Sequence, residues 1–285
     1  MVKKAIVITV LLFAGYSLFL YFFQDRIHRT GQDQYSRNVV KAEEYLYEEG
    51  QEAKVVILGT SMGSRIVMDS LPGDYFNLAM AGMGIFDGLS LLEKASRKPK
   101  VVLIEMNVVL RGQNEDLRKD LFHPVFYPLK AHIPALRKKY QPVAVAKALL
   151  RDRSGSRQDV GLFMPPKHIF DQEVANVMRN SAKEPSQVTL SQRFRKLSQQ
   201  IQALRDENVQ VVFFEMPFYA KAQNLREPTL IRQEFYKYFP VTRFKYIDLP
   251  SDAYDTSDGI HLAPREATRY TLYLRKMLAQ DISGL

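Results

Sequence analysis

A serine early in the chain and an aspartate–histidine pair near its end are the residues whose types and spacing could do chemistry together. Ser61 lies in the pattern GTSMG at residues 59–63, which matches the G-x-S-x-G pattern of a nucleophilic serine. Asp258 stands three residues before His261. In such a set the histidine accepts the serine proton, and the aspartate orients the imidazole and stabilises its protonated form. These residues therefore predict a serine nucleophile that forms an acyl-enzyme.

The position of Ser61 in the chain decides between two settings for such a serine. In an α/β-hydrolase, the nucleophile follows a central strand, with several strands already formed before it. Here an apolar segment and a helical pattern take up most of the chain before the first predicted strand, at residues 54–59. Ser61 therefore belongs to the turn after the first strand, and the α/β-hydrolase setting is excluded.

Short apolar runs alternate with amphipathic helical patterns along the rest of the chain. The runs are continuous rather than alternating, which is typical of strands buried on both faces. Alternation of such strands with helices predicts an α/β fold with a three-layer, doubly wound parallel sheet. Strands are expected at 54–59, 75–82, 100–107, 209–217 and 244–250, and helices at 33–49, 85–97, 189–208 and 263–280.

Residues 111–188 do not follow this alternation. They carry seven prolines and many aromatic and basic residues, and they are too many for a plain connection between strands. We expect an inserted subdomain. Its role stays open between a decorative element and a lid or surface for a polymer or a partner.

The N-terminus predicts a membrane anchor. Residues 5–23 are 19 residues without a charge, and a helix of that length spans roughly 28 Å, close to the ~30 Å hydrocarbon core. The run ends in aromatic residues without the small-residue exit of a cleaved signal peptide. We expect residues 1–29 to be a retained anchor and residues 30–285 to be the catalytic domain.

The charged residues on the two sides of this anchor favour opposite orientations. Lys3 and Lys4 favour a cytoplasmic N-terminus, whereas Arg26 and Arg29 oppose it. We expect a single-pass protein of the cytoplasmic membrane, with the N-terminus inside and the catalytic domain periplasmic or extracellular.

Composition excludes several other classes of function. The chain has no cysteine, so disulfides, thiolate catalysis and cysteine-bound zinc are impossible. The five histidines lack metal-site spacing, so no metal or other cofactor is expected, and no nucleic-acid-binding motif is present. The net charge of +9 fits a basic soluble surface, an anionic membrane surface or an acidic polymer as a partner.

The order of Ser61 and the Asp258-x-x-His261 motif resembles that of the SGNH, or GDSL-type, hydrolase family. The resemblance covers residues 54–110 and 205–280. It implies an SGNH-hydrolase-like fold and a Ser–His–Asp triad in which these three residues are catalytic.

Two further blocks of the family have counterparts in this chain. Residues 77–82, NLAMAG, are similar to the family's Asn-x-Gly-x-x-Gly, with alanine for the first glycine. Asn107 stands where the family has the asparagine of Gly-x-Asn-Asp, and Glu105 replaces the glycine there. The resemblance implies an oxyanion hole made of the Ser61 and Gly82 backbone N–H groups and the Asn107 amide. Taken singly, these residues also fit helix caps, turns and strand ends.

The departures from the pattern, including Thr60 in place of the family's aspartate, look more like divergent, membrane-anchored members of the cell envelope. Those include the D-alanyl transfer proteins of teichoic-acid modification and the O-acetylation proteins of exported polysaccharides. The resemblance implies a serine esterase or O-acyltransferase acting on a polysaccharide or acylated glycan. Its expected partner is an integral membrane acyl-transport protein.

An alternative from another class is a non-catalytic, SGNH-like protein that binds glycan or scaffolds a membrane acylation complex. The retained Asp258 and His261 argue against it, since a binding module needs no base and no orienting carboxylate.

Overall fold

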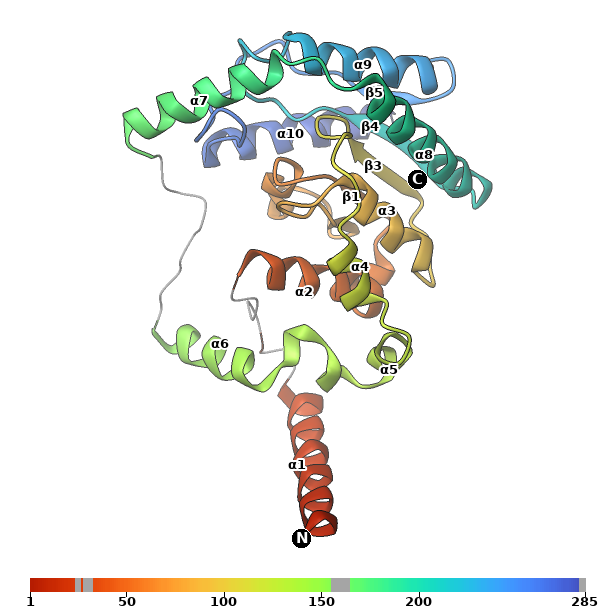
Figure 1. Ribbon diagram of the computed structural model, residues 1–285, viewed down its shortest axis with the longest axis vertical. Coiled ribbons are helices and arrows are strands. Elements are labelled where there is room, and N and C mark those ends of the chain that lie inside the picture. Colours follow the sequence, from red (N-terminus) through yellow and green to blue (C-terminus); the bar gives the residue numbers. More distant parts are fainter. Residues whose placement is uncertain (24–26, 28–32, 155–164, 282–285) are drawn as a thin grey trace. The chain divides into compact units, whose positions relative to one another are not determined.

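The chain divides into two compact units in a computed structural model that describes residues 1–23, 27, 33–154 and 165–281 (Figure 1). The N-terminal unit comprises Met1–Glu48 and Glu115–Gln158, and the sheet unit comprises Glu49–Asn114 and Asp159–Leu285. The predicted active-site residues all belong to the sheet unit. Each unit is described by itself.

A five-stranded parallel sheet forms the centre of the sheet unit. Its strands are β1 (Val55–Leu58), β2 (Tyr75–Asn77), β3 (Val101–Glu105), β4 (Gln210–Phe214) and β5 (Lys245–Ile247). Their spatial order is β2-β1-β3-β4-β5, and every neighbouring pair is parallel. The chain runs from β1 to β2 on one side of the sheet and from β3 to β4 on the other side. The direction of the connections therefore reverses between β1 and β3, and such a switch point is where α/β sheets bind ligands.

Helices cover both faces of this sheet. Alternate strand residues, such as Ile57, Leu103 and Phe214, share one buried cluster with Leu274 of the last helix. On the other face the third helix approaches so closely that a Cβ on Gly88 would lie 2.8 Å from the Leu58 side chain. The helices of this unit are η2 (Glu49–Glu52), η3 (Gly63–Arg65), η4 (Met68–Ser70), α3 (Ile85–Lys94), α7 (Lys167–Ser181), α8 (Gln187–Asp206), α9 (Arg226–Tyr238) and α10 (Pro264–Asp281).

The predicted α/β class and parallel sheet are confirmed. The helix expected at 85–97 ends earlier, at Lys94, and the run at 75–82 is a strand only as far as Asn77. The chain leaves β2 at that point because residues 78–84 form a loop over the end of β1, where Leu78 N–H donates to the Ile57 carbonyl.

The N-terminal unit contains the apolar helix that the sequence predicts. Of the described helices, α1 (Val2–Phe23) is long and apolar enough to cross a membrane. The other helices of this unit are α2 (Gln34–Tyr47), α4 (Glu115–Leu121), α5 (Phe126–His132), η5 (Pro134–Leu136), η6 (Lys138–Tyr140) and α6 (Pro142–Ser154).

Ion pairs join α2 and its C-cap Glu48 to α5 and to the segment that follows it. Lys130 lies 2.7 Å from Glu43, whose side chain is almost completely buried, and Arg137 lies 3.0 Å from Glu48. Lys139 contacts both Glu44 and Glu48. The residues expected as one insertion at 111–188 thus fall in both units: α4 to α6 belong to the N-terminal unit, and α7 to the sheet unit. The predicted domain boundaries stay a prediction.

Candidate active site

Ser61 lies three residues beyond the carboxyl end of β1, next to the switch point of the sheet. The turn is completed by the short 3-10 helix η3, and Ser64 N–H donates to the Thr60 carbonyl across it. No α-helix begins at Ser61, so its hydroxyl is not used as a helix cap.

The structure brings Ser61, His261 and Asp258 into one chain of hydrogen bonds. His261 Nε2 lies 2.8 Å from Ser61 Oγ, although the two residues are 200 positions apart. His261 Nδ1 lies 2.6 Å from Asp258 Oδ2. With Nδ1–H donating to the carboxylate, Nε2 is left to accept the serine proton, which is the arrangement of a general base and its orienting group.

The loop of Asp258 and His261 holds both side chains in place. Asp258 Oδ1 accepts the backbone N–H groups of Ile260 and His261, at 3.0 and 2.8 Å. Gly259 between them has a φ of +84°, a backbone conformation that strongly favours glycine. A bridge from Thr256 to Leu262 closes the loop just before α10 begins. The Asp258 carboxylate is therefore oriented by its own loop as well as by the imidazole.

The Asp258 carboxyl has a pKa of about 2, below its ordinary value. Its burial acts to raise the pKa, but the hydrogen bonds from the His261 side chain and backbone and the nearby imidazole charge outweigh burial. The carboxylate is therefore ionised throughout the neutral range, as its role beside the imidazole requires.

Glu105, to which the sequence assigned no chemistry, lies directly beneath the Ser61 turn. Its side chain is fully buried and accepts three hydrogen bonds, from Thr60 N–H (2.8 Å), the Thr60 hydroxyl (2.8 Å) and Gly63 N–H (2.9 Å). A Cβ on Gly63 would lie 2.7 Å from Glu105 Oε2. The feature of the sequence that could have identified this residue is an acidic side chain at the end of an otherwise apolar strand. Its partners could not be read from that pattern.

Burial raises the pKa of the Glu105 carboxyl, against the opposing effect of its hydrogen bonds. The observed contacts suit either protonation state, because the Thr60 hydroxyl can donate to the carboxylate or accept from a carboxylic acid. Glu105 can therefore shape the Ser61 turn through its hydrogen bonds whether or not it carries a charge.

We expect Glu105→Ala to lower kcat by roughly 10²-fold, because misplacement of a catalytic group by about 1 Å costs that much. Glu105→Gln should keep most of the turnover, since one amide oxygen can accept both N–H groups while the amide nitrogen donates to Thr60. Ester hydrolysis and melting temperature would be measured for both. A Glu105→Gln protein as slow as Glu105→Ala would show that charge, rather than hydrogen bonding, matters.

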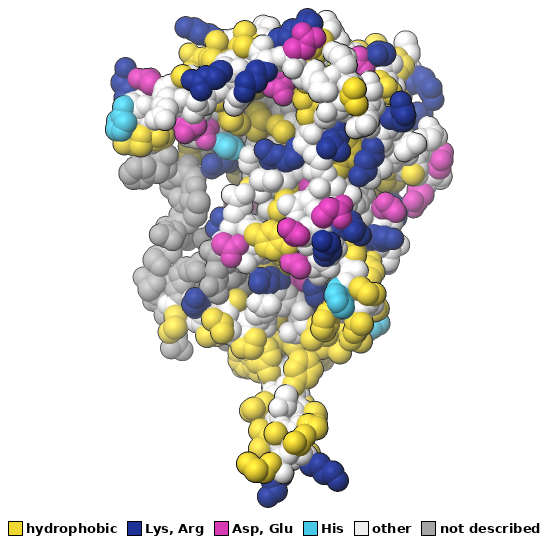
Figure 2. Space-filling view, in the orientation of Figure 1, with side chains coloured by type: hydrophobic (Ala, Val, Ile, Leu, Met, Phe, Trp, Pro, Cys, Tyr) yellow, Lys and Arg dark blue, Asp and Glu magenta, His cyan; other side chains and the backbone are white. Residues whose placement is uncertain are grey.

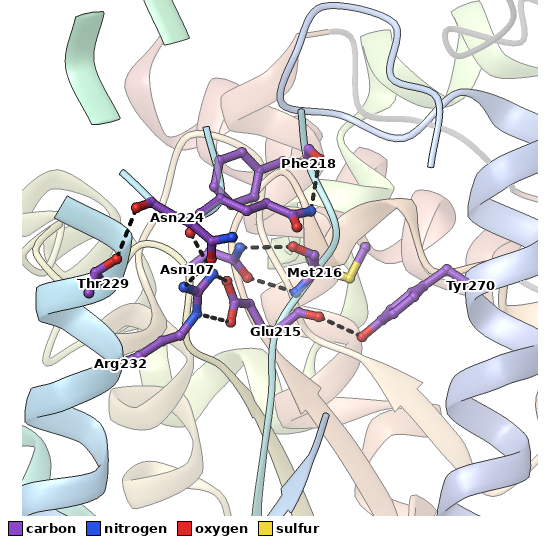
Figure 3. A network of polar contacts seen from close by, with 9 residues as sticks. Asn107, Glu215, Met216, Phe218, Asn224, Thr229, Arg232 and Tyr270 are labelled. Atoms are coloured by element: carbon purple, nitrogen blue, oxygen red, sulfur yellow. Dashed lines mark hydrogen bonds and ion pairs between the residues drawn. The ribbon is translucent and has the colours of Figure 1, made fainter. Parts of the chain in front are cut away.

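Asn107 lies two residues beyond the end of β3, and its amide is bonded to Met216, two residues beyond the end of β4 (Figure 3). Its Oδ1 accepts Met216 N–H at 2.8 Å, and its Nδ2 donates to the Met216 carbonyl at 2.9 Å. These bonds extend the pairing of β3 and β4 and fix the amide; one of its two Nδ2 hydrogens is not used in them.

Gly82 lies in the loop after β2 with a φ of +77° and is exposed. The assignment of Gly82, Asn107 and the Ser61 N–H to an oxyanion hole stays a prediction.

A cavity of about 230 Å³ is lined by residues that adjoin Ser61 and His261 in the chain. Its lining includes the immediate neighbours of Ser61 and His261 and side chains of α7 and α9: Met62, Asn107, Val177, Phe218, Ile231 and Ile260. For scale, an apolar cavity of roughly 150 Å³ accommodates benzene. The cavity therefore has room for a sizeable apolar group beside Met62, the residue that follows Ser61.

An ion pair forms one wall of this cavity (Figure 3). Arg232 donates Nε–H and Nη2–H to the two oxygens of Glu215, both at 2.7 Å, and Nη2 also reaches the Gln223 carbonyl at 2.8 Å. Both side chains are largely buried. Because the Arg232 guanidinium and the Glu215 carboxylate pair with each other, this wall does not present an unpaired cation to an anionic substrate.

Among the residues that the structure describes, no three histidine, aspartate or glutamate side chains are grouped so that they could hold a metal ion.

No protein-family model matches the chain, and no curated protein matches it. Among solved structures, a protein from Streptococcus pneumonia described as a platelet activating factor is similar, with a TM-score of 0.40 and 10% sequence identity. The match covers 90% of this chain and 97% of that chain.

Proposed function

We propose that this protein is an SGNH-type serine enzyme that cleaves an acyl ester and passes the acyl group to water or to a glycan hydroxyl. The observation that carries the proposal is the unbroken chain of hydrogen bonds from Ser61 Oγ through His261 to Asp258. It lies at the carboxyl ends of parallel strands, beside a cavity that can hold part of a substrate.

The first half of the reaction forms an acyl-serine. His261 Nε2 takes the proton of Ser61 as Oγ attacks the ester carbonyl carbon, and a tetrahedral oxyanion forms. The protonated His261 gives that proton to the departing alkoxide as the ester C–O bond breaks. Asp258 stabilises the imidazolium in between. The oxyanion would be met by N–H groups of Ser61 and Gly82 and by the Asn107 amide.

The second half repeats these steps with a new nucleophile. His261 takes a proton from water or from a glycan hydroxyl, whose oxygen attacks the acyl-serine carbonyl. Ser61 leaves with the proton that His261 returns. If water is the acceptor, the protein is an esterase. If a glycan hydroxyl is the acceptor, it is an O-acyltransferase, and both reactions use the same three residues.

The cavity favours a substrate with a partly apolar group. Apolar side chains such as Met62 and Ile231 can bury such a group beside the ion-paired wall. The charged residues Arg111 and Glu227 also line the cavity. An acyl chain longer than acetyl fits the volume of about 230 Å³.

The apolar helix α1 supports membrane anchoring in the cell envelope. We propose that the N-terminus lies in the cytoplasm and the sheet unit outside, where it acts on an envelope polysaccharide. A transferase in that position needs its acyl donor delivered across the membrane, which makes an integral membrane acyl-transport protein the expected partner. Alkaline phosphatase fused after Leu285 should be active if this orientation is right, and inactive if it is reversed.

The proposal is tested with the full-length protein in detergent, given p-nitrophenyl acetate or hexanoate with and without a polysaccharide acceptor. Release of p-nitrophenol measures formation of the acyl-serine, and mass spectrometry of the polysaccharide measures transfer. We expect release with both esters, faster with hexanoate. Binding of the polysaccharide without any release would instead favour the non-catalytic alternative, a glycan-binding or scaffold protein.

A further inference from the structure

We propose that the N-terminal unit lies against the lipid surface through an apolar face of α5 and α6. We call this face the α5–α6 surface. It consists of Val125, Phe126, Leu129, Val143, Leu149 and Leu150, all of them exposed. The inference rests on the proposed anchoring by α1, and it adds a second, interfacial contact with the membrane.

The exposed side of α6 carries large apolar residues. Val143 and Leu150 are 64% and 65% exposed, and they lie seven residues apart, on the same side of the helix. The opposite side is also apolar, with Ala144, Val145 and Ala148 buried. Lys147 lies between Val143 and Leu150 on the exposed side, so this side combines large apolar residues with a basic one, as helices at a membrane surface do.

The start of α5 extends the same kind of surface. Val125, Phe126 and Leu129 are spaced three and four residues apart, so their side chains share one face of the helix. Each is at least 40% exposed. The ion pairs of Lys130 and Arg137 with α2 hold the following segment in position. This apolar face is therefore presented by a fixed structure.

The membrane is the favoured occupant because this surface is continuous with the packing of α1. Leu20, near the end of α1, is buried with Tyr140 and Val145 in one cluster. The Tyr16 hydroxyl donates to the Tyr140 carbonyl at 2.6 Å, so α1 is tied to the segment between α5 and α6. Figure 2 shows hydrophobic side chains gathered where α1 meets these helices. A bilayer that contains α1 would meet the α5–α6 surface at the same boundary.

The distribution of charge fits a membrane with anionic lipid. The N-terminal unit has 16 lysines and arginines, of which Lys3 and Lys4 lie at the far end of α1, and nine acidic residues, whereas the sheet unit has 24 and 22. Most of the net charge of +9 therefore belongs to the smaller unit. Apolar helix faces with nearby basic residues are typical of segments that lie in the plane of an anionic membrane surface.

Because the sequence contains no cysteine, a single introduced cysteine can be labelled specifically. Single cysteines would be introduced by Phe126→Cys and Leu150→Cys, spin-labelled, and examined in the full-length protein in phosphatidylcholine vesicles with and without phosphatidylglycerol. Collision with oxygen, which concentrates in lipid, is compared with collision with a water-soluble nickel complex. Val241→Cys, at a position 66% exposed in the sheet unit, is the matched control for Leu150, and Leu12→Cys reports on α1.

We expect labels at residues 126 and 150 to favour oxygen, as the label at residue 12 does, and the label at residue 241 to favour nickel. The preference should strengthen with phosphatidylglycerol. A lipid-exposed label at residue 12 with water-exposed labels at 126 and 150 would overturn this inference and leave the anchor standing. That result would point to a partner protein on this surface. A water-exposed label at residue 12 would overturn the anchor itself.

Discussion

Ser61→Ala should abolish ester turnover and covalent labelling by a fluorophosphonate. The hydroxyl that the mutation removes is the group 2.8 Å from His261 Nε2, and nothing else in the triad can form the acyl intermediate. Loss of the nucleophile in serine enzymes costs roughly 10⁴- to 10⁶-fold in kcat. Turnover of p-nitrophenyl esters and gel fluorescence of the labelled protein measure the two effects.

The matched control is Ser64→Ala, which removes a hydroxyl three residues away in the same turn. Ser64 Oγ donates to the Ser61 carbonyl and does not contact His261 in the described contacts. This variant should keep its labelling and most of its turnover. If Ser61→Ala were still labelled and Ser64→Ala were not, the nucleophile would be Ser64.

Asp258→Asn should lower kcat by roughly 10⁴-fold with little change in KM, the loss expected when the orienting carboxylate becomes an amide. With the amide oxygen kept on the backbone N–H groups, the amide nitrogen takes the place of Oδ2 and donates to His261 Nδ1, which favours the wrong tautomer of His261. The loop that presents His261 would persist, because the amide oxygen can still accept the N–H groups of Ile260 and His261. Steady-state kinetics and circular dichroism measure activity and fold separately.

The low pKa of Asp258 also predicts how this carboxylate affects stability with pH. Its pKa is about 2 in the folded protein, whereas an unfolded aspartate has one of about 3.9. The ionised form thus stabilises the fold at pH values above the unfolded pKa, and this contribution is lost as pH falls toward 2. The melting temperatures of the wild type and Asp258→Asn should differ at neutral pH and converge in acid. A constant difference would contradict the assigned pKa.

The sequence by itself determined the strands of the sheet, the helices α2, α3, α8 and α10, the α/β class and the apolar helix α1, but not α9 or the helices within residues 111–188. Continuous apolar runs such as residues 54–59 and 100–107 can be buried only inside a layered sheet, and 19 residues without a charge form α1. It also placed the nucleophile candidate after the first strand and the Asp258-x-x-His261 motif before the last helix. These features follow from local patterns, since burial along a strand or helix repeats with the period of the element itself.

The tertiary structure alone decided which side chains meet across the sheet. Glu105 supports the Ser61 turn because β3 lies beside β1, and Asn107 bonds to Met216 because β4 lies on the other side of β3. Strand order is set by packing between segments distant in the chain, and a local pattern does not encode it. The same holds for the α5–α6 surface. Its residues look like ordinary core positions in the sequence, and only the packing of α1, α2 and α6 leaves them exposed.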